Sequence, residues 1–238
     1  MSGHSKWATI KHKKAALDAK RGKKFTKLIK EITVAARTGG GDPTSNAHLR
    51  LLLEKAKQIN MPQDNANRAI KRGTGELPGI SYERCMYEGY GPHNIAVLVD
   101  VLTDNKNKAV AELRHFFSKQ NGTFAESGAV SWMFEKQGVL KGPATDITED
   151  ELMEQLIDYD VSDITIDDGT YIVYCAPTSL DKIRQVLTQL GRAVEHAELE
   201  WVPKNSLSLS DEHAQTAMDF LSGLEDLDDV QNVYTNLE

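Results

Sequence analysis

Apolar residues in the first third of the chain recur at helical spacing. Between residues 25 and 36 they fall at i, i+3, i+4, i+7 and i+11, on one face of a helix. A second stripe runs from Leu49 to Ala56, and a third, short helix after Pro62 is predicted to end at Gly73. Residues 24–72 are therefore predicted to form a three-helix unit.

The pattern then changes to strands. Cys85–Tyr90 and Ile95–Leu102 flank the turn Gly91-Pro92-His93-Asn94, which predicts a hairpin. Asn105 can start a helix whose apolar face runs from Ala109 to Phe117. Residues 130–134 read as a further strand.

Residues 138–202 carry a regular local pattern. The sequence Thr148-Glu149-Asp150-Glu151 is a capping box before a helix, and Asp168-Gly169 lies between two alternating segments, as in a hairpin. Ser179 can start a second helix that ends at Gly191. The predicted order of elements is βαββαβ, a ferredoxin-like unit.

The segment before this unit has only one helix to cover its sheet, and the tail can supply the second. Ser210 can start a helix, and a strand is expected near residues 230–234. We therefore expect an α+β protein with an N-terminal three-helix unit and basic arm, plus two ferredoxin-like α+β domains, one inserted in the other. The expected domains are residues 1–78, residues 79–135 plus 205–238, and the inserted residues 136–204.

Charge divides the chain sharply. Residues 1–72 hold 17 Lys and Arg against 5 Asp and Glu, while the whole chain has a net charge of −7. A basic segment on an acidic body is typical of nucleic-acid binding, although a solvated, lysine-rich helical surface is the alternative. The clustered acids Glu225, Asp226, Asp228 and Asp229 are expected to be solvated and to repel anionic polymers.

The predicted nucleic-acid-binding residues are the cations of this basic segment, with Trp7 and His12 among them. Lysine supplies point-charge contacts to phosphate, whereas arginine can bind it in a bidentate manner. The set is Lys6, Trp7, Lys11, His12, Lys13, Lys14, Lys20, Arg21, Lys23, Lys24, Lys27, Arg68, Lys71 and Arg72. Because no base-reading helix is evident, the partner is expected to be recognised by phosphate contacts and shape, which does not choose between DNA and RNA.

A second patch is predicted near the strand ends, from Tyr87, Tyr90, Asn105 and Asn107. It would combine an aromatic pair with polar side chains and form one concave surface with the basic segment. The alternative is that the two tyrosines only pack between domains.

Catalytic and metal-binding motifs are missing from the sequence. There is no phosphate-binding loop of the GK[ST] type, no GxSxG elbow and no HExxH, and the aspartates from Asp158 to Asp168 lack the spacing of a calcium loop. No cofactor, metal site, small-molecule substrate or enzymatic activity is therefore expected. The N-terminal residues lack the apolar segment of a secretory signal, no apolar run is long enough to span a membrane, and the two cysteines suit a reducing cytosol. We expect a cytoplasmic protein with no membrane partner.

Several segments, spread along nearly the whole chain, resemble the YebC/PmpR family. They are the opening residues 1–14, Asn60-Met61-Pro62-Gln63-Asp64-Asn65, Arg68-Ala69-Ile70-Lys71, Tyr87–Pro92, and Leu102–Asn105 with Asn107. The chain departs from the family pattern at His93-Asn94 and at Thr123-Phe124-Ala125, which affects turn detail only.

This resemblance implies a three-domain cytoplasmic protein, a probable transcriptional regulatory protein related to the mitochondrial translational activator of cytochrome oxidase. The family is described as DNA-binding transcriptional regulators, and members are also linked to translation, including ribosomes stalled on proline-rich sequences. Two partners thus stay open, duplex DNA and ribosomal RNA with the ribosome. Competition between them at matched salt would separate the two hypotheses.

Overall fold

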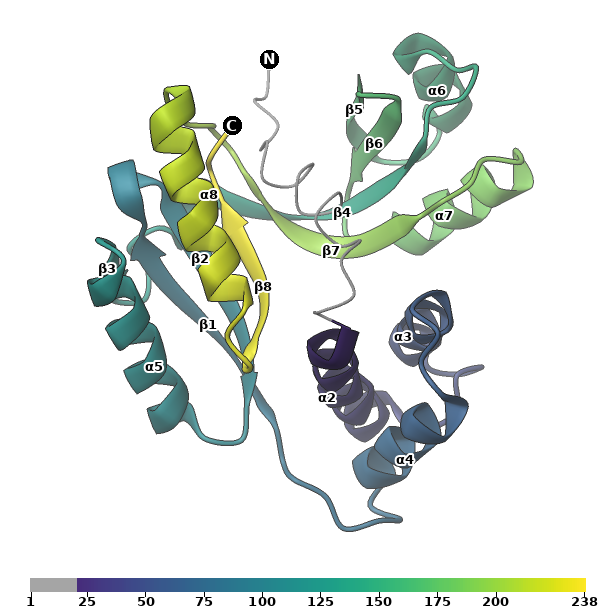
Figure 1. Ribbon diagram of the computed structural model, residues 1–238. Coiled ribbons are helices and arrows are strands. Elements are labelled where there is room, and N and C mark those ends of the chain that lie inside the picture. The colour runs from purple at the N-terminus through teal and green to yellow at the C-terminus, as the bar shows by residue number, and fades with distance from the viewer. Residues whose placement is uncertain (1–20) are drawn as a thin grey trace. The chain divides into compact units, whose positions relative to one another are not determined.

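The structure, a computed structural model, describes residues 21–238 and confirms the mixed α+β class, with helices followed by two four-stranded antiparallel sheets (Figure 1). The described chain divides into two compact units. One contains residues 21–131 and 206–238, and the other contains residues 132–205.

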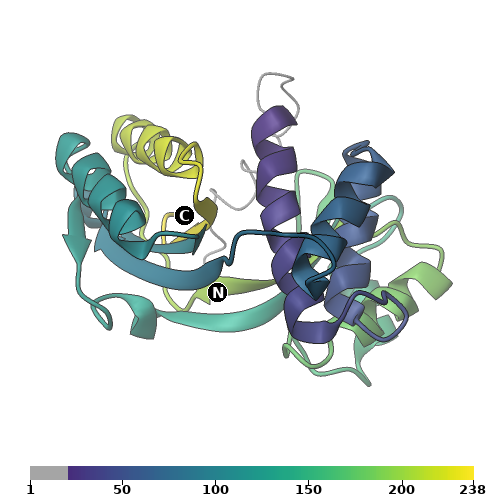
Figure 2. The same cartoon turned by 90° about the horizontal axis from the view of Figure 1, so that it is seen from below.

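The first unit begins with the predicted three-helix head. Its helices are α2 (Arg21–Gly39), α3 (Ala47–Gln58) and α4 (Gln63–Thr74). They pack around a core that includes Leu28, Ile32 and Leu49, and they lie side by side in both views (Figures 1 and 2). Asn46 begins α3 by accepting a hydrogen bond from the Leu49 N–H at 3.0 Å, which satisfies one of the free donors of the first turn.

The predicted end of the third helix was wrong. Gly73 lies inside α4, and the helix ends one residue later, with the left-handed Gly75 as its C-terminal cap. A Cβ atom at Gly73 would lie 2.4 Å from the Thr33 carbonyl oxygen of α2. Glycine is therefore needed at position 73 for close approach of two helices rather than for helix termination.

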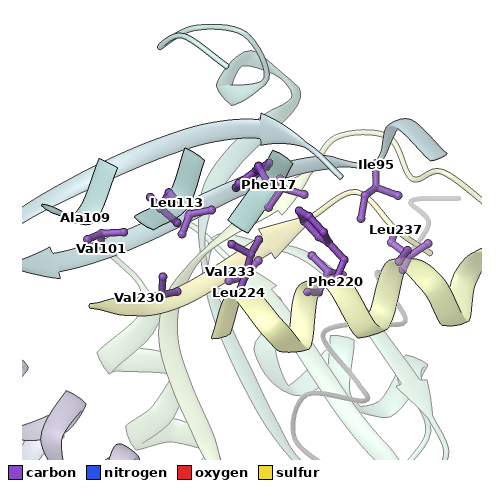
Figure 3. Packing of buried hydrophobic residues seen from close by; sticks show 14 residues of the cluster. Ile95, Val101, Ala109, Leu113, Phe117, Phe220, Leu224, Val230, Val233 and Leu237 are labelled. Atoms are coloured by element: carbon purple, nitrogen blue, oxygen red, sulfur yellow. The ribbon is translucent and has the colours of Figure 1, made fainter. Parts of the chain in front are cut away.

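The head is followed by a sheet that draws its strands from distant parts of the chain. Its elements are β1 (Glu83–Tyr90), β2 (Ala96–Thr103), α5 (Lys106–Lys119), β3 (Thr123–Ala125), α8 (Asp211–Glu225) and β8 (Val230–Thr235). The strand order is β3-β1-β2-β8, and β8 pairs antiparallel with β2. Figure 3 shows the core between this sheet and helices α5 and α8, where the rings of Phe117 and Phe220 meet edge to face at 5.2 Å.

The strand predicted at residues 130–134 was also wrong. Glu88, which is 4% exposed, accepts the backbone N–H groups of Gly128, Val130 and Ser131 at 2.7–2.9 Å. Burial raises the pKa of Glu88, but these hydrogen bonds outweigh burial and leave the pKa below its usual value. Because the carboxylate occupies the backbone donors, the segment forms a loop and a short 3-10 turn (η4, Ser131–Met133) instead of a ladder.

The second unit has the predicted βαββαβ order. Its elements are β4 (Phe134–Pro143), α6 (Glu149–Leu156), β5 (Val161–Asp167), β6 (Thr170–Cys175), α7 (Leu180–Gln189) and β7 (His196–Pro203). Thr148 and Glu151 form the expected capping box, and Asp168 and Gly169 both adopt positive φ in the β5–β6 turn. The strand order β5-β6-β4-β7 is that of a ferredoxin-like sheet.

The domain boundaries expected from the sequence stay a prediction that truncation tests. Deleting residues 207–238 removes α8 and β8, and with them Phe220, Leu221 and Val233 from the core of the first sheet. We expect amide hydrogen exchange in β1 and β2 to lose its protection, while β4 and β6 keep theirs. An unchanged cooperative melt of the truncated protein would contradict the discontinuous domain.

Candidate nucleic-acid interface

The predicted cations fall into three groups by position. Seven of the predicted residues lie outside the described residues: Lys6, Trp7, Lys11, His12, Lys13, Lys14 and Lys20. Arg21, Lys23, Lys24 and Lys27 lie on α2, and Arg68, Lys71 and Arg72 lie on α4. The cations of the two helices differ in whether their side chains have hydrogen-bond partners within the described residues.

On α2, two of the predicted lysines contact the end of α8. Lys23 Nζ donates to the Asp226 carbonyl oxygen at 2.8 Å, and Lys27 Nζ donates to the Glu225 carbonyl oxygen at 2.7 Å. The last carbonyls of a helix lack intrahelical partners and carry partial negative charge, so nearby ammonium groups stabilise them. These two lysines therefore stabilise a helix end as they stand in this structure.

One turn further along α2, Lys30 forms a buried ion pair. Its Nζ donates to Asp229 Oδ1 at 2.6 Å and to the Asp228 carbonyl oxygen at 3.1 Å, and both Lys30 and Asp229 are 8% exposed. Thr103 Oγ1 donates to the other carboxylate oxygen of Asp229 at 2.8 Å. Burial raises the pKa of Asp229, but the hydrogen bonds from Lys30 and Thr103 outweigh burial and lower it.

This contact corrects the expectation that the acids at residues 225–229 are all solvated. Asp228 is exposed, but Asp229 is buried, and the carbonyls of Glu225 and Asp226 accept from lysines. A hollow of about 360 Å³ lies beside the contact, lined by four ammonium groups and two carboxylates. Its charged lining residues are Lys23, Lys27, Lys30, Lys108, Asp228 and Asp229.

On α4, the three predicted cations share one face. Arg68, Lys71 and Arg72 are spaced i, i+3 and i+4, and all three are exposed. Within residues 21–238, no hydrogen bond or ion pair engages their side chains. The packing of Gly73 against Thr33 fixes how α4 lies on α2, so this cationic face is held rigidly.

The structure separates one member of the second predicted patch, Tyr90, from the two asparagines. In the β1–β2 hairpin, Tyr90 pairs with Ala96 at one end and Glu83 pairs with Thr103 at the other, so Asn105 and Asn107 lie at the far end from Tyr90. Side chains alternate along a strand, so Tyr87 and Tyr90 point to opposite faces. Tyr90 therefore does not share a patch with the two asparagines, whereas Tyr87 lies near Lys106, which stands between them in sequence.

Three of these four residues have structural partners instead. Tyr87 packs against Phe124 with ring centroids 5.9 Å apart, and the Tyr90 hydroxyl donates to the Ala129 carbonyl oxygen at 3.2 Å. Asn105 Oδ1 accepts the Lys108 N–H at 3.1 Å and begins α5. Asn107 is exposed on the first turn of that helix.

A groove of about 900 Å³ in the head was not predicted as a site, although the motif at residues 60–65 supplies part of its lining. It lies between α3 and the first turn of α4 and is lined by both cations and amides, including Arg50, Lys57, Gln63 and Asn67. Helical spacing could have found it, since Arg50 and Lys57 are seven residues apart and Gln63 and Asn67 are four apart. In the described part of the chain, no three or more His, Cys, Asp or Glu side chains form a group suited to a metal ion, and no helix is long and apolar enough to cross a membrane.

Nearly the whole chain is similar in sequence to known proteins. Residues 5–76 match a family described as the TACO1/YebC protein N-terminal domain, and residues 82–237 match one described as the TACO1/YebC second and third domain.

Two relatives and one solved structure are similar over almost their full lengths. Probable transcriptional regulatory protein DP2908 of Desulfotalea psychrophila is 52% identical, covering 100% of this chain and 96% of that protein. Probable transcriptional regulatory protein CT1665 of Chlorobaculum tepidum is 48% identical, covering 100% and 95%. The crystal structure of the conserved hypothetical protein Aq1575 from Aquifex aeolicus has a TM-score of 0.84 and 43% identity, covering 93% of this chain and 91% of that one.

The Lys30–Asp229 pair generates a stability prediction. Replacing Lys30 by Met leaves the Asp229 carboxylate buried without its ammonium partner, and removing one member of such a pair costs about 3–5 kcal/mol of unfolding free energy. Lys23→Met is the matched control, because its exposed contact is worth about 1 kcal/mol or less. Urea unfolding measures both, and equal small losses would contradict a central role for the pair.

The same pair sets a pH dependence. The pKa of Asp229 is lower in the folded than in the unfolded state. The contribution of its carboxylate to the free energy of unfolding is therefore complete above the ordinary Asp pKa of about 3.9, and it is lost as the pH falls through the lower pKa of the folded state. The difference in stability between the wild type and Asp229→Asn should therefore shrink on acidification through this window. A difference that is constant from neutral pH down to the acid transition would contradict this assignment.

Proposed function

The chain belongs to the TACO1/YebC family, and from this premise we propose that it is a nucleic-acid-binding regulatory protein that acts as a DNA-binding regulator of transcription. The names of the relatives DP2908 and CT1665 support the regulatory role. We include in the proposal that the protein is cytoplasmic, has no enzymatic activity and has nucleic acid as its partner.

The observation that carries the proposal is the cationic face of α4. Arg68, Lys71 and Arg72 are exposed on one side of a rigidly packed helix, so their charges are available to an external anion. A polyanion gains from such a row because each phosphate contact releases condensed counterions. The seven predicted residues before Arg21, which lie outside the described residues, would add further contacts to phosphate.

A second candidate is binding to ribosomal RNA or the ribosome as a translation factor, including at stalled, proline-rich sequences. The amide-lined groove between α3 and α4 favours it, because side-chain amides suit the exposed edges of unpaired bases. The two candidates share the α4 face and differ in the geometry of the target.

The α4 face is tested by the double substitution Lys71→Ala with Arg72→Ala. We expect weaker binding to all sequences tested and a log K against log salt slope that is smaller by about 2, because two phosphates are no longer neutralised. The control is Lys119→Ala with Lys136→Ala, which removes the same charge from exposed positions outside the head. Fluorescence anisotropy over a salt series measures both, and equal effects of the two pairs would refute a role specific to α4.

Competition separates the two targets. Labelled duplex DNA bound to the protein is challenged with ribosomes and with unlabelled duplex at one fixed salt concentration, since affinities at different salt cannot be compared. A transcriptional regulator should retain promoter-region DNA against an equal concentration of ribosomes. Displacement by ribosomes at far lower concentration than by duplex would transfer the proposal to translation.

A further inference from the structure

The groove in the head is built by two helices whose lining residues follow helical spacing. Arg50, Leu53 and Lys57 come from one face of α3, and Gln63 and Asn67 come from one face of α4. Its volume of about 900 Å³ lies within the range of about 300–1,000 Å³ that small-ligand sites occupy. The groove thus has the size of a binding site for a few ring-sized groups.

The connection between the two helices fixes the floor of the groove. Asn60 adopts a left-handed conformation with φ of 55°, and the Met61 N–H donates to the Ala56 carbonyl oxygen at 2.8 Å. Met61 is 8% exposed and belongs to the core of the head. Because the turn is anchored in this core, the lining groups are held in place before any ligand arrives.

The lining combines three kinds of chemistry. Asn60, Gln63 and Asn67 each carry a donor and an acceptor, and within residues 21–238 none of these amide groups has a hydrogen-bond partner. Leu53, which is partly buried, adds apolar surface. Two cations complete the set, since Lys57 is exposed and Arg50 donates one Nη1 hydrogen bond to the Pro43 carbonyl oxygen at 3.1 Å, which leaves other guanidinium donors for a ligand.

We propose that this groove binds unpaired nucleotides, an inference that rests on the proposed nucleic-acid function and names the form of nucleic acid that the head recognises. Bases lie against Leu53 and present their edges to the amides of Gln63 and Asn67. Arg50 and Lys57 hold the flanking phosphates. A base in a duplex has its Watson–Crick edge occupied and offers an amide only its groove edges, whereas an unpaired base offers its Watson–Crick edge as well.

Charge within the groove favours nucleotides over a purely acidic ligand. Glu54 also lines it, so an anion bound there would meet a carboxylate. The amino group of a cytosine is instead a good donor to a carboxylate, and bases are neutral. A lining that combines cations, amides and one carboxylate suits neutral bases on a charged backbone better than a purely acidic ligand.

The test compares amide variants on labelled oligonucleotides of one length: single-stranded RNA, single-stranded DNA and duplex DNA. Gln63→Ala with Asn67→Ala should lower affinity for single strands about tenfold. It should leave duplex affinity and the salt slope unchanged, because it removes no charge. The matched control is Gln58→Ala with Asn65→Ala, the same chemical change on α3 and α4 outside the groove. Melting temperatures of both variants show that the head remains folded.

Photocrosslinking gives a second, independent readout. An RNA that carries 4-thiouridine should crosslink to a peptide within residues 50–67 of the wild type, and the adduct should fall in the amide variant. Preference between the RNA and DNA strands identifies the source of the unpaired nucleotides.

The outcomes separate the two proposals. The groove proposal is refuted if the Gln63→Ala, Asn67→Ala variant loses duplex and single-strand affinity equally, or loses no more than the control variant. Neither result affects the proposed role of the α4 face. Binding of duplex but not of single strands by the wild-type protein would also refute the groove proposal and leave the α4 proposal unaffected. Wild-type protein that binds no nucleic acid at low salt overturns the groove and the proposed function together.

Discussion

The buried ion pair between Lys30 and Asp229 ties the head to the rest of its unit. The Lys30 ammonium meets the carboxylate of Asp229, a residue that follows α8, and Asp229 is also bound by Thr103 at the end of β2. The Asp229 carbonyl oxygen accepts the Leu102 N–H at 2.8 Å as well. Removing charges from water is costly unless every hydrogen-bonding group finds a partner, so such a pair tolerates little displacement. It therefore sets the register of α2 against two segments far away in sequence.

This constraint decides which cations of the head are available. Lys23 and Lys27 lie on the same side of α2 as Lys30 and accordingly meet the carbonyls that end α8. The cations of α4 face elsewhere and meet no such acceptors among residues 21–238. A strong positive balance in the sequence is thus not a count of phosphate contacts, because part of it stabilises the protein itself.

Local features were predictable from the sequence, whereas features made by distant partners were not. The three helices, the Thr148–Glu151 capping box and the Asp168-Gly169 turn depend on neighbours in sequence, and all are present. The loop at residues 128–131 depends on Glu88, forty residues earlier, so its local β pattern misled. Gly73 was interpreted as a helix end because its reason for being glycine, the Thr33 carbonyl, lies on another helix.

The residues of the candidate site also separate into those that the sequence could place and those that depend on distant partners. Spacing alone places Arg68, Lys71 and Arg72 on one face, but no local pattern shows that Lys27 is engaged by α8 or that the β1–β2 hairpin separates Tyr90 from Asn105. The pairing of β2 with β8 has a further consequence during synthesis. At about 5–20 residues per second, roughly 6–25 s pass between the emergence of the two strands from the ribosome. For that time β2, whose eight residues are all buried in the finished protein, has an open edge. Asp100 interrupts its apolar run, and a polar group in that position discourages pairing with other nascent chains; its partner Arg84 comes from the earlier strand β1, and β8 later covers the edge.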